Sequence, residues 1–175
     1  MGAACILVVE VIIKQMKIFI GADHAGFKLK ESLKRWLEST GYNCEDVGNL
    51  SFEPVDDYPD FSYRMAAAVT LNPTSRGVMI CGSSLGACIV ANKVRGIRAV
   101  SVHNVKEAKL SRQHNDANVL CLAGGHLKEG GHGVGLPLSL AKKIVTAWLK
   151  EPFSRAGRHR RRVNQIRAIE RKNLL

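Results

Sequence analysis

Gly77–Lys93, with the sequence GVMICGSSLGACIVANK, combines a buried strand, a tight turn and a helix. The apolar run Gly77–Cys81 predicts the strand, Gly82-Ser83-Ser84 interrupts it, and a helix is expected from about Leu85 to Lys93. In such a unit the N–H groups of the first helical turn point at whatever lies beyond the strand end. The stretch therefore predicts an anion-binding turn with the thiol of Cys81 beside it.

Cys81 has two interpretations at this position. A thiol beside the positive end of a helix is expected to ionise more easily than a free thiol, and could then act as a base or nucleophile. A free cysteine in a strand is otherwise a small apolar core residue. The turn is not a P-loop, because no Gly-Lys-Ser/Thr follows, and it is not a dinucleotide fingerprint, because Ala-Cys-Ile follows Gly86. The residues alone leave both interpretations of Cys81 open.

Strands and helices alternate on both sides of this stretch. Further strands are expected at Lys17–Gly21, Asn43–Val47, Gly96–Val102 and Val119–Leu122, and helices at Phe27–Ser39, Phe61–Leu71, Val105–Gln113, Leu138–Lys150 and Arg155–Lys172. This alternation predicts a Rossmann-like three-layer αβα sandwich with a five-stranded parallel sheet and a C-terminal basic helix. Ligands bind beyond the carboxyl ends of such strands. We therefore expect Asp23, His24 and the turn after Cys81 on one rim, with the polar loop Asn49–Pro59 as a wall.

The polar groups near these strand ends also allow a structural interpretation. Asp23 and His24 could orient hydroxyls and move protons, or they could be a helix N-cap and a solvated histidine. His114 with Asn115 could serve as an acid or base, or could cap a helix. Arg158 and Arg162, four residues apart on one helical face, could clamp a phosphate or form a solvated basic face.

Charge and cysteine content limit the classes of function. The 175 residues carry a formal net charge of +11, and more than half of the excess lies in residues 150–175. Phosphorylated ligands, nucleic acid or solubility could each explain this tail. Phe153 is its only aromatic residue, which argues against nucleic acid. Five widely spaced cysteines without a CxxC pair predict reduced thiols in a cytoplasmic protein, with neither a zinc site nor a disulfide framework.

Residues 1–15 are interpreted as an N-terminal extension that need not be native, before a single domain at residues 16–175. The segment is apolar but shorter than the roughly 20 residues of a membrane-spanning helix. It lacks the basic start and cleavage site of a secretory signal. An extra edge strand or an anchor is the alternative.

Six segments in order resemble one known family, over about residues 16–170. They are KIFIGADHAGFKLKE, DYPDF, CGSSLGACIVANK, GIRA, SRQHNDANVL and GRHRRRV, and they resemble the ribose-5-phosphate isomerase B / galactose-6-phosphate isomerase subunit family. The resemblance implies an aldose–ketose isomerase of the pentose phosphate pathway that interconverts ribose 5-phosphate and ribulose 5-phosphate without a metal or other cofactor. It also implies a homodimer or dimer of dimers with sites shared between subunits, and no nucleic-acid or membrane partner. Another aldose phosphate (a hexose or a tetrose), a phosphosugar-binding protein without turnover, and a Cys–His hydrolase are the alternatives.

The resemblance assigns a role to each candidate site residue. Cys81 would shuttle a proton between sugar C2 and C1, and His114 would open the furanose ring. The resemblance also implies that the enediolate oxygen is held by Ser83 and by the backbone of Gly82, Ser84, Leu85 and Gly86. The sugar hydroxyls would be bound by Asp23, His24 and Asn115. The phosphate would be bound by Arg158 and Arg162. The phosphate-binding half is expected to come from the other subunit.

Three positions depart from the family pattern. Ser84 stands where a glycine is usual, so it is strained if its φ is positive and otherwise narrows the pocket. Cys88 replaces a serine. Gly125-His126 stands where a phosphate-binding arginine is usual, in a lengthened loop, so that His126, His132 or Lys128 would have to substitute for it.

Overall fold

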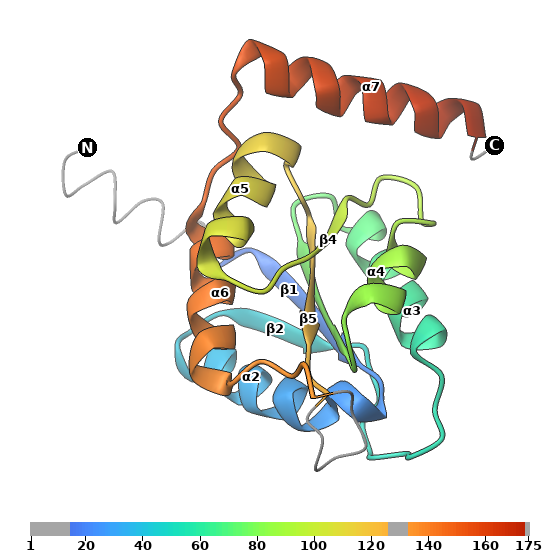
Figure 1. Ribbon diagram of the computed structural model, residues 1–175, viewed down its shortest axis with the longest axis vertical. Coiled ribbons are helices and arrows are strands. Elements are labelled where there is room, and N and C mark those ends of the chain that lie inside the picture. The colour runs from blue at the N-terminus through green and yellow to red at the C-terminus, as the bar shows by residue number, and fades with distance from the viewer. Residues whose placement is uncertain (1–14, 126–132, 174–175) are drawn as a thin grey trace.

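A five-stranded parallel sheet forms the middle layer of the protein, as the computed structural model in Figure 1 shows. The structure describes residues 15–125 and 133–173. The strands are β1 (Lys17–Ala22), β2 (Asn43–Asp46), β3 (Arg76–Cys81), β4 (Ala99–Ser101) and β5 (Val119–Ala123), in the order β2-β1-β3-β5-β4. The three central strands are buried almost throughout, as expected for a parallel sheet that is covered on both faces.

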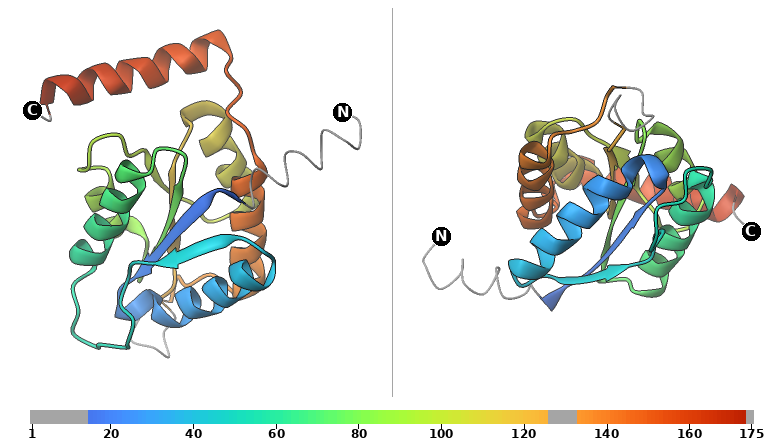
Figure 2. Two further views of the ribbon diagram at one scale, coloured as in Figure 1. Left: turned by 180° about the vertical axis from the view of Figure 1, so that it is seen from behind. Right: turned by 90° about the horizontal axis from the view of Figure 1, so that it is seen from below.

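Helices cover the two faces of the sheet (Figure 2). One face carries α2 (Phe27–Ser39), α5 (Val105–Asn115) and α6 (Leu138–Lys150), and the other carries α3 (Tyr58–Leu71) and α4 (Leu85–Ala91). A 3-10 turn, η1 (His24–Gly26), joins β1 to α2. The last helix, α7 (Gly157–Asn173), lies across the amino ends of the strands. The predicted three-layer fold with a C-terminal basic helix is confirmed.

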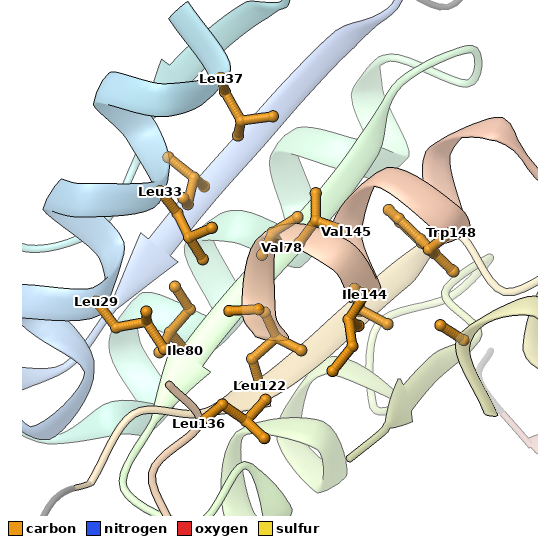
Figure 3. Close-up of a cluster of buried hydrophobic side chains, with 14 of the residues drawn as sticks. Leu29, Leu33, Leu37, Val78, Ile80, Leu122, Leu136, Ile144, Val145 and Trp148 are labelled. Carbon is orange, nitrogen blue, oxygen red and sulfur yellow. The ribbon is translucent and has the colours of Figure 1, made fainter. Parts of the chain in front are cut away.

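The larger core lies between the sheet and helices α2 and α6 (Figure 3). Leu29, Leu33 and Leu37 recur every fourth residue of α2, so they form one stripe that faces the sheet. Trp148 of α6 is completely buried in the same cluster. Each such side chain contributes roughly 1.5–3 kcal/mol by leaving water, and this packing fixes the strand ends relative to one another.

Several element boundaries differ from those expected. Helix α3 begins at Tyr58 rather than Phe61, because Pro59 occupies the first helical turn, where its missing N–H is not needed. Helix α5 continues to Asn115, so His114 belongs to the helix and does not follow it. The strand expected at Gly96–Val102 shortens to β4, because Gly96 has φ +84° and the N–H of Ile97 turns back to Val94.

Some of the sequence-based expectations fall on residues that the structure does not describe. These are the proposed extension up to residue 14 and the three candidates for the missing phosphate contact, His126, Lys128 and His132. No helix in the described ranges has the length and apolar character needed to cross a membrane.

Candidate active site

The carboxyl ends of the three central strands are level with one another. Residues Ala22 and Ile80 pair across β1 and β3, and Cys81 and Ala123 pair across β3 and β5. This register brings Asp23 and His24 beside the turn that follows Cys81. The fit requires Gly26, because a Cβ there would lie 2.4 Å from the carbonyl oxygen of Ile80. The predicted rim is therefore present.

Ser84 adopts the left-handed backbone conformation, with φ +69°, immediately before α4. A non-glycine residue in this region is strained, because its Cβ crowds the carbonyl oxygen. The hydroxyl of Ser84 is buried and lies 2.5 Å from the hydroxyl of Ser101 on β4. It also donates to the carbonyl of Ser83. The strained alternative predicted for Ser84 is confirmed.

Cys81 is buried at the base of this turn, and its pKa is raised above that of a free thiol. Burial is the largest cause, and the nearby charge of Asp23 acts in the same direction. Hydrogen bonds from the backbone N–H groups of Ala87, Ser84 and Ser83 lower the pKa but do not outweigh burial. The prediction that Cys81 ionises more easily than a free thiol is wrong for the chain on its own. The backbone donors around the sulfur are nevertheless those that the turn predicted.

Asp23 is the N-cap of η1, because its Oδ1 accepts from the N–H of Gly26 at 2.9 Å. Its carboxyl is buried, and burial raises its pKa. His24 is held more firmly than a solvated histidine. Its Nδ1 lies 2.7 Å from Oδ1 of Asp56, and its backbone N–H donates to the same oxygen at 2.9 Å. The Asp56 carboxylate raises the pKa of His24 and favours the imidazolium form.

Asp56 is a site residue that the sequence analysis did not identify. Its other carboxylate oxygen accepts from Nδ2 of Asn49 at 2.8 Å. The carbonyl of Asn49 in turn accepts from the ammonium of Lys30, which is fully buried and also bonds Asp46 at 2.7 Å. These hydrogen bonds hold the loop after β2 against η1 and α2. Its polar composition predicted a wall, but no pattern in the sequence pairs Asp56 with a residue 32 positions away.

Tyr58 closes the same side of the turn. A Cβ at position 86 would lie 2.6 Å from Cζ of Tyr58, so only glycine allows the ring to rest against the first turn of α4. The implied contacts at Leu85 and Gly86 thus sit beside an aromatic ring. Leu85 itself is 58% exposed.

His114, Asn115, Arg158 and Arg162 lie at the opposite edge of the sheet. Helix α5 ends just before β5 begins, and β5 then runs from Val119 to Ala123, beside Cys81. Strand β5 alone spans roughly 13 Å, so His114 and Cys81 of one chain are too far apart to touch one sugar carbon. Figure 1 shows the end of α5 and the whole of α7 above the sheet, and α2, which directly follows η1, below it. The structure therefore divides the predicted site residues into two groups.

The second group is joined by His159, which the sequence analysis also did not identify. The rings of His114 and His159 are in contact at a tilt of 41°, with centroids 4.3 Å apart. Nε of Arg158 donates to Nε2 of His159 at 3.1 Å, so Nδ1 carries the proton and donates to Oγ of Ser154, 2.6 Å away. Burial lowers the pKa of His159, and the charges of His114, Arg158 and Arg162 add to this. A neutral His159 thus orients both His114 and Arg158.

The described residues contain no group of three or more His, Cys, Asp or Glu side chains that could hold a metal ion.

Asn115 is the last residue of α5, and its backbone carbonyl accepts a hydrogen bond from Nε of Arg98 at 3.0 Å.

Known protein sequences match this chain over nearly its whole length. The pattern of the family described as Ribose/Galactose Isomerase matches residues 18–166. Ribose-5-phosphate isomerase B of Escherichia coli is 43% identical over 156 residues, covering 89% of this chain and 97% of the relative. A probable ribose-5-phosphate isomerase B of Mycoplasma pneumoniae is 40% identical over 154 residues, covering 88% of this chain and 95% of the relative.

Solved structures of such proteins share the fold. Ribose-5-phosphate isomerase B of Clostridium thermocellum superposes with a TM-score of 0.79 at 45% identity, over 90% of this chain and 99% of the other. The Mycoplasma genitalium protein, solved with bound ribulose-5-phosphate, superposes with a TM-score of 0.82 at 38% identity, over 91% and 99%.

Proposed function

This chain belongs to the Ribose/Galactose Isomerase family and is an aldose–ketose isomerase, and we propose that it interconverts ribose 5-phosphate and ribulose 5-phosphate in sites shared by two copies of the chain. The proposed substrate follows the names of the relatives and the ribulose-5-phosphate bound to the Mycoplasma genitalium protein. The enzyme would act in the pentose phosphate pathway of the cytoplasm, where its thiols stay reduced.

Cys81 acts as the base in this proposal. Its thiolate takes the proton from C2 of the aldose, which leaves an enediolate, and returns the proton to C1 of the ketose. The hydroxyl proton moves from O2 to O1 in the same interconversion, and Asp23 and Ser83 lie on the rim where that exchange would occur. The N–H groups of Ser83, Ser84 and Ala87 bond the sulfur and favour the thiolate. In the proposal, the Ser83 hydroxyl and the remaining backbone N–H groups of residues 82–86 stabilise the developing oxyanion.

The second copy supplies the other half of the site. This part of the proposal is supported by the contacts of His159 with His114 and Arg158, which lie at the edge of the sheet remote from Cys81. In the proposal, His114 of a second copy opens the sugar ring, while Asn115, Arg158 and Arg162 of that copy hold the sugar oxygens and the phosphate. A twofold dimer would create two equivalent sites of this kind.

Exposed apolar side chains occur on the elements that such a dimer would need to cover. Leu85 and Ile89 of α4 are 58% and 62% exposed, and Ile166 and Ile169 of α7 are 41% and 59% exposed. Large apolar side chains gathered near a functional site are typical of an interface between subunits.

An isomerisation assay with ribose, allose, galactose and erythrose phosphates tests the proposal. We expect the wild-type enzyme to prefer ribose 5-phosphate, and Cys81→Ala to lose turnover about 10³-fold or more while still binding the sugar phosphate. Full activity in Cys81→Ala would refute the base assignment. Preference for a six-carbon or four-carbon sugar phosphate would refute the proposed substrate but would leave the proposed isomerisation unchanged. A covalent adduct on Cys81, seen by mass spectrometry, would instead indicate a hydrolase.

A further inference from the structure

A second basic pocket lies on the side of α7 away from Arg158 and Arg162. It has a volume of about 290 Å³, and its lining residues are Asp116, Phe153, Arg155, Arg160, Val163, Asn164 and Arg167. Arg160, Asn164 and Arg167 repeat at three- and four-residue spacing, so they form one stripe of the helix. Neither of the proposed phosphate ligands, Arg158 and Arg162, lines this pocket.

The charge of the pocket is strongly positive. Its one carboxylate, Asp116, is already neutralised, because Oδ2 bonds Nη2 of Arg98 and Oδ1 bonds Nη1 of Arg112, both at 2.9 Å. Within residues 15–125 and 133–173, Arg155, Arg160 and Arg167 form no ion pair with a carboxylate. Three arginines thus line a small cavity, and none of them is paired with a carboxylate of the described residues.

Arg155 is held in a conformation that arginine disfavours. Its φ is +53°, in the left-handed region where glycine is the usual residue. A strained residue beside a cavity points to a requirement for that side chain, because glycine would satisfy the backbone at lower cost. Arg155 is thus a strained residue that lines the pocket together with Arg160 and Arg167.

We propose that this pocket is a second anion site, which binds a compact polyanion of the pyrophosphate or bisphosphate class. Guanidinium groups recognise phosphate oxygens with paired, charge-assisted hydrogen bonds, and three of them match a ligand with two phosphate groups. The volume is at the lower limit for ligand pockets, so it suits a ligand of this size rather than a whole nucleotide. Phe153 and Val163 supply the apolar part of the lining.

Calorimetric titration with inorganic pyrophosphate, with and without saturating ribose 5-phosphate, tests this site. We expect one pyrophosphate per chain to bind in both conditions. The double variant Arg160→Gln/Arg167→Gln should bind at least about tenfold more weakly. The matched control Arg161→Gln/Lys172→Gln removes the same charge from another face of α7, outside the pocket, and should change the affinity by no more than about twofold.

Arg155→Gly separates binding from folding. The substitution relieves the strained backbone, so the variant should melt at a higher temperature than the wild type and yet bind pyrophosphate more weakly. Equal losses in both double variants would mean non-specific attraction to a basic helix and would overturn the proposal. Displacement of pyrophosphate by ribose 5-phosphate would assign the binding to the sugar-phosphate site and overturn it as well. Because the readout is binding, the outcome does not depend on whether the chain isomerises ribose 5-phosphate.

Discussion

The charge of Asp23 acts directly on the thiol of Cys81. Both groups are buried at the rim, and each has a pKa that burial raises. Asp23→Asn keeps a side-chain oxygen that can cap η1 but removes the negative charge, so it should lower the pKa of Cys81. We expect half-maximal alkylation of Cys81 by iodoacetamide at a lower pH in this variant than in the wild type, with the modified peptide quantified by mass spectrometry.

The matched control for this prediction is Asp57→Asn. Asp57 is exposed in the loop before α3, so its loss should leave the pH profile of Cys81 unchanged. A profile that does not move in Asp23→Asn would show that this carboxylate does not influence the thiol.

Asp56 controls the protonation of His24. The hydrogen bond that the Asp56 carboxylate accepts from the His24 ring raises the pKa of His24 above its ordinary value of 6.5. Asp56→Asn should therefore lower this pKa, which an NMR titration of the His24 ring would detect. Because the folded-state pKa is raised, the interaction stabilises the wild type fully below pH 6.5 and is lost as the pH rises through the folded value.

Urea unfolding provides a second measure of the same interaction. The difference in the free energy of unfolding between wild type and Asp56→Asn should be largest below pH 6.5 and should shrink at higher pH. A difference that grows with pH would contradict the assignment.

At the scale of elements, the turn between β3 and α4 is strained at Ser84. Ser84→Gly and Ser84→Ala both remove the hydroxyl that contacts Ser101, but only glycine relieves the positive φ. We expect the Gly variant to exceed the Ala variant in free energy of unfolding by about 1–2 kcal/mol, measured by urea denaturation. This is the reverse of their usual order in helices. An Ala variant as stable as the Gly variant would mean that the backbone is not strained there.

The buried strands were predictable from the sequence, whereas some element boundaries were not. The runs KIFIG, GVMIC and VLCL predict buried strands because, apart from Lys17 at the start of the first, they contain no charged residue and no polar alternation. Strand β4 was overpredicted because Gly96 and Ile97 turn before pairing begins. Helix α3 begins before the predicted Phe61, because Pro59 is favoured in the first helical turn and does not exclude a helix there.

For the whole molecule, the order of elements predicted the fold but only half of the site. Residues that follow strands, Asp23, His24 and Ser83, do gather at one rim. His114 precedes a strand, so the topology places it at the other edge, and this could have been inferred from its position before β5. The partners Asp56 and His159 depend on loop and helix geometry that no local pattern encodes. The raised pKa of Cys81 likewise depends on burial of the turn, because burial raises this pKa more than the surrounding N–H groups lower it.

In the proposed dimer, Cys81 of one chain and His114 of another form one catalytic site. Two inactive variants, Cys81→Ala and His114→Ala, provide the test. A mixed dimer would contain one site that lacks both groups and one site that is intact.

Mixing the two variants after mild dissociation, and assaying ribose 5-phosphate isomerisation, is the most direct measurement. Random reassociation of equal amounts places half of the chains in mixed dimers, so about a quarter of the wild-type specific activity should return. Each variant treated alone should stay inactive. A mixture that forms mixed dimers, as native mass spectrometry would show, and yet remains inactive would contradict a site shared between two chains.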